Sequence, residues 1–402
     1  MPELLCPAGD MERLRTAVQY GADAVYLAGE EFGMRTSPAN FNYSQLPEAV
    51  SFAHERGVKA FVACNTFPRN DELARMPEFL ELAAAYRADA FIVCDLGTMS
   101  LVKKHTPSVD IHMSVGTGVV NHLSAREYYN LGAKRVILSR ELSLEEIAEI
   151  RAKTPKELEL EAFVHGAICV SFSGRCLLSN YMTGRDANRG DCAQPCRWKY
   201  TLCEEKRPGE FFPVFEDGQG SHILNSKDLN LIRHIPELAA AGISSFKIEG
   251  RAKSVYYTAV TANAYRQAID GYLANPGDYT PEEWIVDELD KISHREYFTG
   301  FYHGAPQNGQ CLNNGGYIRE CMIAAVAEGY KDGMLQLTQR NKFKKGDTLE
   351  VLQPGARPFD LCVSELYNEQ GEAIEAASHA MMELMIPCGK SVPKGSILRI
   401  SI

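Results

Sequence analysis

Residues 1–270 alternate short runs of β-forming residues with segments of helical hydrophobic period. This alternation is typical of βαβ units, which build a parallel sheet with helices between the strands. Helical stretches such as Met11–Tyr20, Glu72–Tyr86 and Leu144–Ala152 separate the first seven runs. The eight runs are Leu4–Cys6, Ala24–Ala28, Ala60–Asn65, Ala90–Cys94, Ile111–Val115, Arg135–Leu138, Leu160–Val164 and Ser245–Ile248. Eight such strands predict an α/β fold of the (β/α)8 TIM-barrel type.

A doubly wound sheet with six strands is the competing arrangement for such a pattern. A dinucleotide-binding sheet of that kind carries a G-x-G-x-x-G turn after its first strand, where the glycines allow close approach of a pyrophosphate. The sequence after Leu4–Cys6 has no such turn. The barrel is therefore the favoured prediction.

The chain divides into three predicted parts. The barrel domain spans 1–275 and includes a long insert at 166–243, after the seventh strand. A connection of that length is far longer than usual, and long loops of this kind are commonly functional. Residues 276–317 form a linker or helical extension, and the short β runs of 318–402 predict a small β-barrel domain.

Composition indicates a globular cytoplasmic protein. The chain starts without a basic, apolar leader, and we find no run of about 18 apolar residues that could span a membrane. Twelve cysteines in such a chain are more typical of reduced thiols and ligands than of a disulfide framework. The formal charge of −10 means that a nucleic acid would have to bind a local basic surface, for example the run Arg340, Lys342, Lys344 and Lys345.

Four of the cysteines lie within 28 residues of the insert, with the spacing C-x6-C-x15-C-x3-C. They are Cys169, Cys176, Cys192 and Cys196. The spacing matches neither a zinc ribbon nor a ferredoxin run. From the residues alone an iron–sulfur centre is favoured, while zinc, a redox disulfide and unrelated thiols remain alternatives.

In (β/α)8 barrels the working face lies at the carboxyl ends of the strands. Several predicted strands are followed there by polar residues, which are candidates for a shared site. These are Asn65, Thr66, Asp95, Ser114, Arg140, Glu141, His165, Glu249 and Arg251. The insert would cover this face and bring its cysteines toward His165, Arg140 and Glu249.

Several longer motifs resemble the collagenase-like peptidase family, U32, from nearly one end of the chain to the other. They include ILSRELSLEEI, FVHGAICVSFSGRCLLSNY, RDANRGDCAQPCRWKY, RPGE, FEDGQG, NSKDL and KIEGRAKSVYY. Within the family they are most similar to the branch of prephenate-dependent tRNA uridine hydroxylases. Fewer motifs of the C-terminal part contribute to the resemblance.

The resemblance implies an enzyme that hydroxylates the wobble uridine of tRNA to 5-hydroxyuridine without molecular oxygen. It implies prephenate as co-substrate and a [4Fe–4S] cluster with ligands at Cys169, Cys176, Cys192 and Cys196. Some relatives take their fourth ligand from the residue after the KDL motif, which is Asn230 here, so Cys196 is the expected fourth ligand. The partners we expect are tRNA, through its anticodon loop, and prephenate, with an accessory protein as a further candidate and no membrane.

The chemistry of the candidate residues suggests roles for them in this reaction. Arg140, Arg175 and Arg251 could bind the two carboxylates of prephenate, and His165 or Glu249 could move protons. Lys227 and Asp228 of the KDL motif are expected to bind substrate. A flipped uridine would need aromatic stacking partners. Nearby candidates are Trp198, Tyr200, Phe172 and Tyr181.

Three other functions remain in competition with tRNA hydroxylation. A peptidase is suggested by the family name, but the sequence has no HExxH pair and no G-x-S-x-G elbow. A cysteine protease would have to use Cys169 or Cys176 with His165. A hydroxylase of another RNA or of a quinone precursor is the second alternative, and a non-catalytic RNA-binding protein stabilised by a metal is the third.

Overall fold

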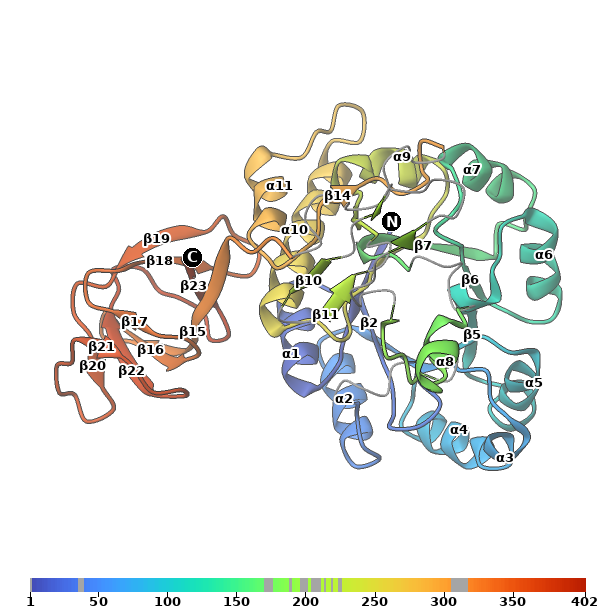
Figure 1. The fold of residues 1–402 in the computed structure, drawn as a ribbon, viewed down its shortest axis with the longest axis horizontal. Coiled ribbons are helices and arrows are strands. Elements are labelled where there is room, and N and C mark those ends of the chain that lie inside the picture. Colours follow the sequence, from blue (N-terminus) through green and yellow to red (C-terminus); the bar gives the residue numbers. More distant parts are fainter. Residues whose placement is uncertain are drawn as a thin grey trace.

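The computed structural model describes residues 2–34, 40–169, 176–187, 190–195, 226–304 and 317–402, together with the backbone of four short strands between 202 and 222. The barrel forms the larger body, and a β domain lies beside it (Figure 1). No helix in these ranges has the length and apolar composition needed to cross a membrane.

Eight parallel strands close into a barrel in the order β13-β1-β2-β3-β4-β5-β6-β7, and β13 pairs back with β7. Most positions in these strands are buried, because barrel-filling side chains cover one face and helices the other. The strands are β1 (Glu3–Pro7), β2 (Ala24–Leu27), β3 (Lys59–Cys64), β4 (Ala90–Val93), β5 (Asp110–Met113), β6 (Arg135–Ile137), β7 (Glu159–Ala167) and β13 (Ser245–Ile248). The predicted (β/α)8 barrel is confirmed.

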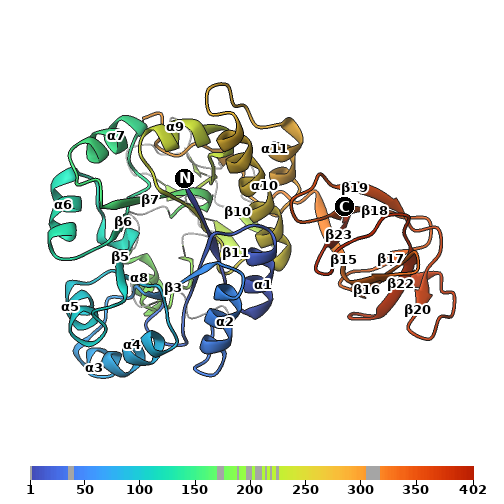
Figure 2. The ribbon, with the colours of Figure 1, turned by 180° about the vertical axis from the view of Figure 1, so that it is seen from behind.

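Helices surround this ring of strands on the outside (Figures 1 and 2). They are α1 (Met11–Gln19), α2 (Gln45–His54), α3 (Asn70–Leu73), α4 (Met76–Ala85), α5 (Leu96–His105), α6 (His122–Asn130), α7 (Leu144–Ala152), α9 (Ile235–Ala240), α10 (Val255–Ala274) and α11 (Glu283–Asp290). The side chains of Asp10, Asp95, Asn121, Ser143 and Ser254 cap the amino ends of α1, α5, α6, α7 and α10.

One predicted helix is wrong in detail. Glu72–Tyr86 was expected to be continuous, but the structure has two helices, α3 and α4, that meet near Arg75. Pro77 lies in the first turn of α4. Proline is tolerated there, whereas inside one long helix it would remove a hydrogen bond and clash with the preceding turn.

Strand β7 contains an irregularity that decides the direction of its last side chains. Lys247 of β13 pairs with Phe163, but Ile248 pairs with His165, so Val164 is an extra residue in β7. Gly166 follows with a φ of +105°, and a Cβ atom there would lie 2.4 Å from the carbonyl oxygen of Glu249. This β-bulge lets β7 continue beyond the barrel to Ala167.

The insert adds strands and a helix between β7 and β13. Strand β12 (Asp228–Asn230) of the insert runs antiparallel to the end of β7, and β14 (Tyr297–Phe298), which lies outside the insert and after α11, pairs with β12 in parallel. The other insert elements are α8 (Leu178–Thr183), β8 (Leu202–Cys203), β9 (Phe211–Phe212), β10 (Phe215–Asp217) and β11 (Gly220–His222). In Figure 1, α8 lies over the ring of strands.

The C-terminal domain is an antiparallel sheet curled around its own apolar core. Its strand order is β19-β18-β23-β15-β16-β22-β20, with β17 and β21 paired separately. These strands are β15 (Cys321–Lys331), β16 (Met334–Gln339), β17 (Phe343–Lys344), β18 (Thr348–Leu352), β19 (Phe359–Cys362), β20 (Tyr367–Asn368), β21 (Ala376–Ala377), β22 (Glu383–Pro387) and β23 (Ile397–Ser401). The small β domain is confirmed, and its described strands form a half-barrel with edges at β19 and β20.

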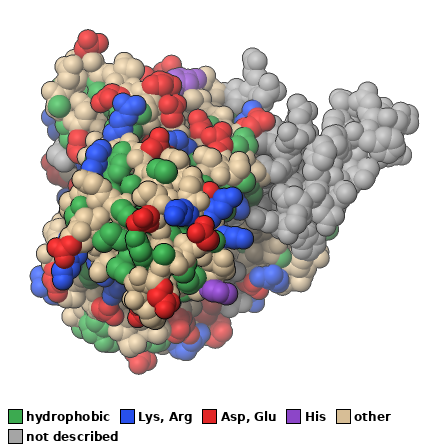
Figure 3. Space-filling view, turned by 90° about the vertical axis from the view of Figure 1, so that its left-hand side faces the viewer, with side chains coloured by type: hydrophobic (Ala, Val, Ile, Leu, Met, Phe, Trp, Pro, Cys, Tyr) green, Lys and Arg blue, Asp and Glu red, His purple; other side chains and the backbone are tan. Residues whose placement is uncertain are grey.

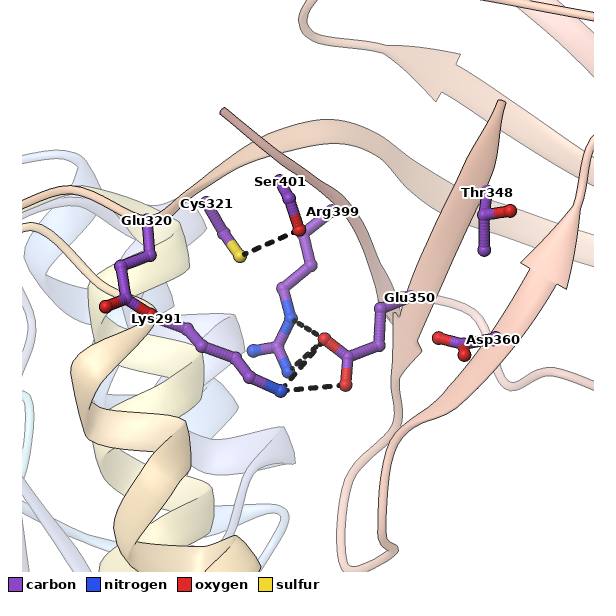
Figure 4. A pocket seen from close by; sticks show the side chains of 8 residues that line it. All are labelled: Lys291, Glu320, Cys321, Thr348, Glu350, Asp360, Arg399 and Ser401. Atoms are coloured by element: carbon purple, nitrogen blue, oxygen red, sulfur yellow. Dashed lines mark hydrogen bonds and ion pairs between the residues drawn. The ribbon is translucent and has the colours of Figure 1, made fainter. Parts of the chain in front are cut away.

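A buried ion-pair network joins the two domains. Arg399 of β23 is 0% exposed and pairs with Glu288 of α11 at 2.6 Å and with Glu350 of β18 at 2.8 Å. Lys291, just after α11, lies 2.9 Å from Glu350. Arg399, Glu350 and Lys291 line an interdomain cavity of about 460 Å³ (Figure 4).

Candidate active site at the carboxyl end of the barrel

A buried charge cluster fills the middle of the barrel. Glu161 of β7 is 0% exposed and accepts hydrogen bonds from Arg135 at 2.9 Å and from Lys247 at 2.9 Å. Burial raises the pKa of Glu161, but the two cations outweigh burial and lower the pKa overall. The Lys247 ammonium also lies 5.5 Å from the ring centre of Phe163. This packed layer fills the barrel interior, and (β/α)8 barrels carry their sites at the carboxyl ends of the strands.

The arginines predicted to bind carboxylates lie at that end. Arg140 follows β6, and its guanidinium donates a hydrogen bond of 2.7 Å to the carbonyl of Ala167 and lies 4.8 Å from the Phe163 ring centre. Arg251 follows β13 and donates to the carbonyl of Met34, in the loop after β2. Both side chains are buried. These contacts orient both guanidinium groups, and a guanidinium is the side chain best suited to bidentate pairing with a carboxylate.

The structure places His165 away from the barrel interior. Because of the bulge at Val164, the imidazole packs against α10 and β14, with ring centres 5.9 Å from Tyr257, 5.5 Å from Tyr265 and 5.4 Å from Tyr297. Its exposed fraction is 1%, and among the described residues its Nε2 has no hydrogen-bond partner. Desolvation lowers the pKa of His165 to about 3, so the ring is neutral at ordinary pH. Its role in proton transfer stays a prediction.

Glu249 is the other residue predicted to move protons, and it lies at the end of β13. Its backbone N–H donates to the carbonyl of His165 at 2.9 Å, and its carbonyl accepts from the Tyr257 hydroxyl at 2.8 Å. The residue is half-buried. The structure therefore puts Glu249 and Arg251 together after β13, while His165 lies on the other side of the strand layer.

The KDL motif is held by residues far away in the sequence. Arg295 binds Asp228 through its Nε at 2.9 Å and its Nη2 at 2.7 Å, and both residues are buried. Burial raises the pKa of Asp228, but the Arg295 guanidinium outweighs burial and lowers it. Lys227 pairs with Glu296 at 2.8 Å. The predicted substrate contacts of Lys227 and Asp228 stay predictions, and both side chains already tie β12 to the segment before β14.

Sequence reasoning missed Arg295 and the tyrosines around His165. Arg295 lies 67 residues after Asp228. The sequence His-Arg-Glu around Arg295 matches no known motif. The tyrosines of α10 have the spacing of ordinary core residues in an amphipathic helix. Only the pairing of β12 with β7 and β14 brings these groups together.

Three of the four predicted ligand cysteines are described. Cys169 and Cys192 are exposed, Cys176 is half-buried, and none of the three is in a disulfide. Within the described ranges, no three His, Cys, Asp or Glu side chains come together as a metal site. Cys196 lies outside the described residues, as do Arg175 and Trp198. Accessible free thiols are suitable donors for an iron–sulfur cluster, and the ligand assignment stays a prediction.

The insert is attached to the rim of the barrel. Asp186, after α8, lies 3.8 Å from Arg69, which follows β3. The backbone N–H of Ala193 donates to the buried Ser179 hydroxyl at 2.9 Å, and Arg185 pairs with Asp191 at 2.6 Å. These contacts hold the segment between Cys176 and Cys192 at the end of the barrel where Arg140, Glu249 and Arg251 lie.

The fold and this arrangement define a class of proteins in which a (β/α)8 barrel carries a cysteine-bearing insert at its carboxyl end and a C-terminal β domain. Residues 9–311 match the model of peptidase family U32, and residues 319–399 match that of the peptidase family U32 C-terminal domain. The chain belongs to peptidase family U32.

Several relatives are named for RNA hydroxylation. The chain is 34% identical over 401 residues to tRNA hydroxylation protein P1 of Bacillus subtilis, covering 99% of this chain and 94% of that protein. It is 36% identical over 419 residues to tRNA hydroxylation protein P of Escherichia coli, covering 94% and 91%. It is 35% identical over 317 residues to the 23S rRNA 5-hydroxycytidine C2501 synthase of Escherichia coli, covering 75% of this chain but 46% of that enzyme.

Proposed function

We propose that this protein is an RNA hydroxylase that converts the wobble uridine of tRNA to 5-hydroxyuridine in the cytoplasm. The observation that carries the proposal is the likeness to tRNA hydroxylation proteins over 99% and 94% of the chain, which includes the C-terminal domain. The likeness to the rRNA synthase covers 75% of this chain and less than half of that enzyme, which favours tRNA over ribosomal RNA.

We further propose that a [4Fe–4S] cluster is held by Cys169, Cys176, Cys192 and Cys196. When bound, such a cluster supplies one-electron redox chemistry. Support comes from the three described thiols, which are accessible and free at the end of the barrel. Buried thiols behave differently, because desolvation raises the pKa of Cys6 and Cys64 and disfavours the thiolate that a metal needs.

Prephenate is the co-substrate in this proposal. Its two carboxylates would meet Arg140 and Arg251, which are held in place through the carbonyls of Ala167 and Met34. Glu249, half-buried next to Arg251, is the proposed group for proton transfer.

Peptidase activity is less well supported, although the family is named for it. A cysteine nucleophile in the insert would need His165 as its base. That imidazole is 1% exposed among three tyrosine rings, and its pKa is lowered to about 3 by burial. A base with that pKa would take up a proton poorly near neutral pH.

The test is mass spectrometry of nucleosides from bulk tRNA of a strain that lacks the gene. We expect 5-hydroxyuridine and its derivatives to disappear, to return with the intact gene, and to stay absent with Cys176→Ala. Cys362→Ala is the matched control, because Cys362 is also exposed but lies on β19 of the other domain. An unchanged nucleoside profile, in a strain without a second enzyme for this step, would rule out the proposed function.

A further inference from the structure

Exposed apolar side chains of the barrel domain gather at one end. Among the described residues, eight large hydrophobic side chains of this domain are exposed, and seven of them follow the carboxyl end of a strand or lie in the insert. Six form the group that we call the apolar rim: Leu96, Val120, Leu123, Leu177, Tyr181 and Met182. Tyr43, after β2, is the seventh, and Leu131, at the opposite end of α6, is the exception.

The topology places the apolar rim on one side of the carboxyl end. Leu96 follows β4, while Val120 and Leu123 follow β5, the next strand in the barrel. Leu177, Tyr181 and Met182 belong to α8 and the residue before it, and this part of the insert reaches the rim at Arg69, after β3. Isolated exposed apolar residues are ordinary, but a group confined to the working end of a barrel indicates a binding surface.

Among the described residues, three arginines near the apolar rim are paired with carboxylates. Arg69 lies 3.8 Å from Asp186, Arg75 pairs with Glu31, and Arg185 pairs with Asp191. On the face of the molecule seen in Figure 3, blue and red side chains are mixed and form no broad basic stripe. Arg340 of the basic run in the C-terminal domain is bound to Glu12 of the barrel, which leaves Lys342, Lys344 and Lys345 exposed.

We propose that the apolar rim is a stacking surface for unpaired nucleobases of the RNA loop that contains the target base. The inference rests on the proposed function and adds how the substrate is recognised, namely through the faces of its bases. Tyr181 is the central platform, because its side chain is 78% exposed and lies between Cys176 and Cys192 in the sequence. Aromatic rings bind bases of any sequence in this way, and RNA loops present such unstacked bases.

The experiment measures binding of the full-length protein to a tRNA anticodon stem-loop. Tyr181→Ala is expected to weaken binding about tenfold, which is within the range for losing one base-stacking contact. Tyr181→Phe keeps the ring and should bind like the unaltered protein. Leu131→Ala is the matched control, since Leu131 is exposed at the opposite end of the barrel. Equal affinity of the Tyr181→Ala and unaltered proteins would overturn the inference.

Salt dependence gives an independent readout. Each phosphate contact makes the slope of log affinity against log salt more negative by about 0.7 for single-stranded nucleic acid. We expect the slope to be the same for Tyr181→Ala and the unaltered protein, because stacking on the Tyr181 ring adds no phosphate contact. A steep slope that falls in Tyr181→Ala would show phosphate binding instead of stacking.

Crosslinking separates RNA from a protein partner. With Leu123→p-benzoylphenylalanine in cells, we expect RNA to be crosslinked, and crosslinks to protein alone would overturn the inference. The proposed function is tested separately by the tRNA nucleoside profile. Suppose that the nucleoside profile depends on the gene but Tyr181→Ala binds RNA normally. This result would reject the stacking surface and would still support the proposed hydroxylase function.

Discussion

The role that the sequence suggests for His165 differs from the environment in which the structure places this residue. In the sequence it follows a barrel strand and resembles a catalytic base, but in the structure it is a neutral imidazole among Tyr257, Tyr265 and Tyr297. Its Nε2 has no hydrogen-bond partner in the part of the chain that the structure describes, and it is buried in surroundings that disfavour a positive charge. Protonation of His165 would therefore destabilise the folded protein, and its position in the sequence does not indicate this effect.

This environment predicts a pH dependence of stability. The folded-state pKa of about 3 lies below the ordinary value of 6.5, so between these values the unfolded chain binds a proton that the folded protein does not. The free energy of unfolding should consequently fall as the pH drops from 6.5 toward 3, by about 1.4 kcal/mol per pH unit from this residue. Above pH 6.5 the contribution should be constant.

His165→Phe is the variant that tests this, because an aromatic ring of similar shape without a titrating group replaces the imidazole. Urea unfolding at several pH values between 7 and 5 should show a shallower loss of stability in His165→Phe than in the unaltered protein. His105→Phe is a control, since His105 is a surface residue paired with Glu81. Identical slopes for His165→Phe and the unaltered protein would show that His165 takes up a proton in the folded state.

At the scale of elements, the bulge in β7 separates the two groups of site residues. Phe163 still contacts Lys247 and Arg140 on the barrel side, whereas His165 contacts α10 and β14. Gly166 makes this course possible, because it has a φ of +105° and lies against the backbone of Glu249. The end of β7, from which Cys169 follows, therefore depends on this glycine.

Gly166→Ala should destabilise the fold by several kcal/mol. The new Cβ would lie 2.4 Å from the Glu249 carbonyl oxygen and 2.9 Å from the Tyr257 hydroxyl, and a backbone contact of that kind cannot relax by a side-chain rotation. Gly57→Ala is the matched control, because Gly57 also has a positive φ, of +72°, but a Cβ there meets nothing within 4 Å. It should cost about 1 kcal/mol. Urea unfolding measures both, and equal costs would show that β7 adapts to the added methyl group.

The barrel could be predicted from sequence because each strand and helix has a local hydrophobic period. All eight predicted strands overlap observed ones, and Leu144–Ala152 has the predicted ends. The bulge at Val164 could not be predicted, since it depends on the register of β7 against β13, a strand formed about 80 residues later. For the same reason the pairing of Asp228 with Arg295 was missed. Local patterns predict elements, while the directions of site residues depend on pairing across the whole barrel.

At the scale of the molecule, the two domains are joined by an ion pair whose two charged side chains, one from each domain, are both buried. Arg399 comes from the last strand of the C-terminal domain and Glu288 from α11 of the barrel domain, and their side chains are 0% and 3% exposed. Tyr20 of the barrel adds a hydrogen bond of 3.0 Å from its hydroxyl to the carbonyl of Leu352. Such an interface couples the unfolding of the domains, because neither charge can be solvated while the domains remain docked.

Arg399→Met should uncouple the two domains. The substitution keeps an apolar side chain in the interface but removes one of the two cations that pair with the buried Glu288 among the described residues. Lys291 then remains beside it, at 3.0 Å, so we expect a loss of about 3–5 kcal/mol. Lys394→Met is the matched control, because Lys394 pairs with Glu328 at the surface and is 74% exposed, and it should cost less than about 1 kcal/mol.

The measurement follows urea unfolding with tryptophan fluorescence, which reports on the barrel domain because it contains both tryptophans, Trp198 and Trp284, and with far-UV circular dichroism, which reports on both domains. In the unaltered protein the two signals should change at the same urea concentration. In Arg399→Met the free energy that docks the domains is reduced, so the two unfolding curves should have different midpoints. Adding Glu288→Leu to Arg399→Met should recover part of the lost stability, because the unpaired carboxylate is then removed as well. If the double variant is no more stable than Arg399→Met, the loss comes from packing of the Arg399 side chain, and the ion pair does not couple the domains.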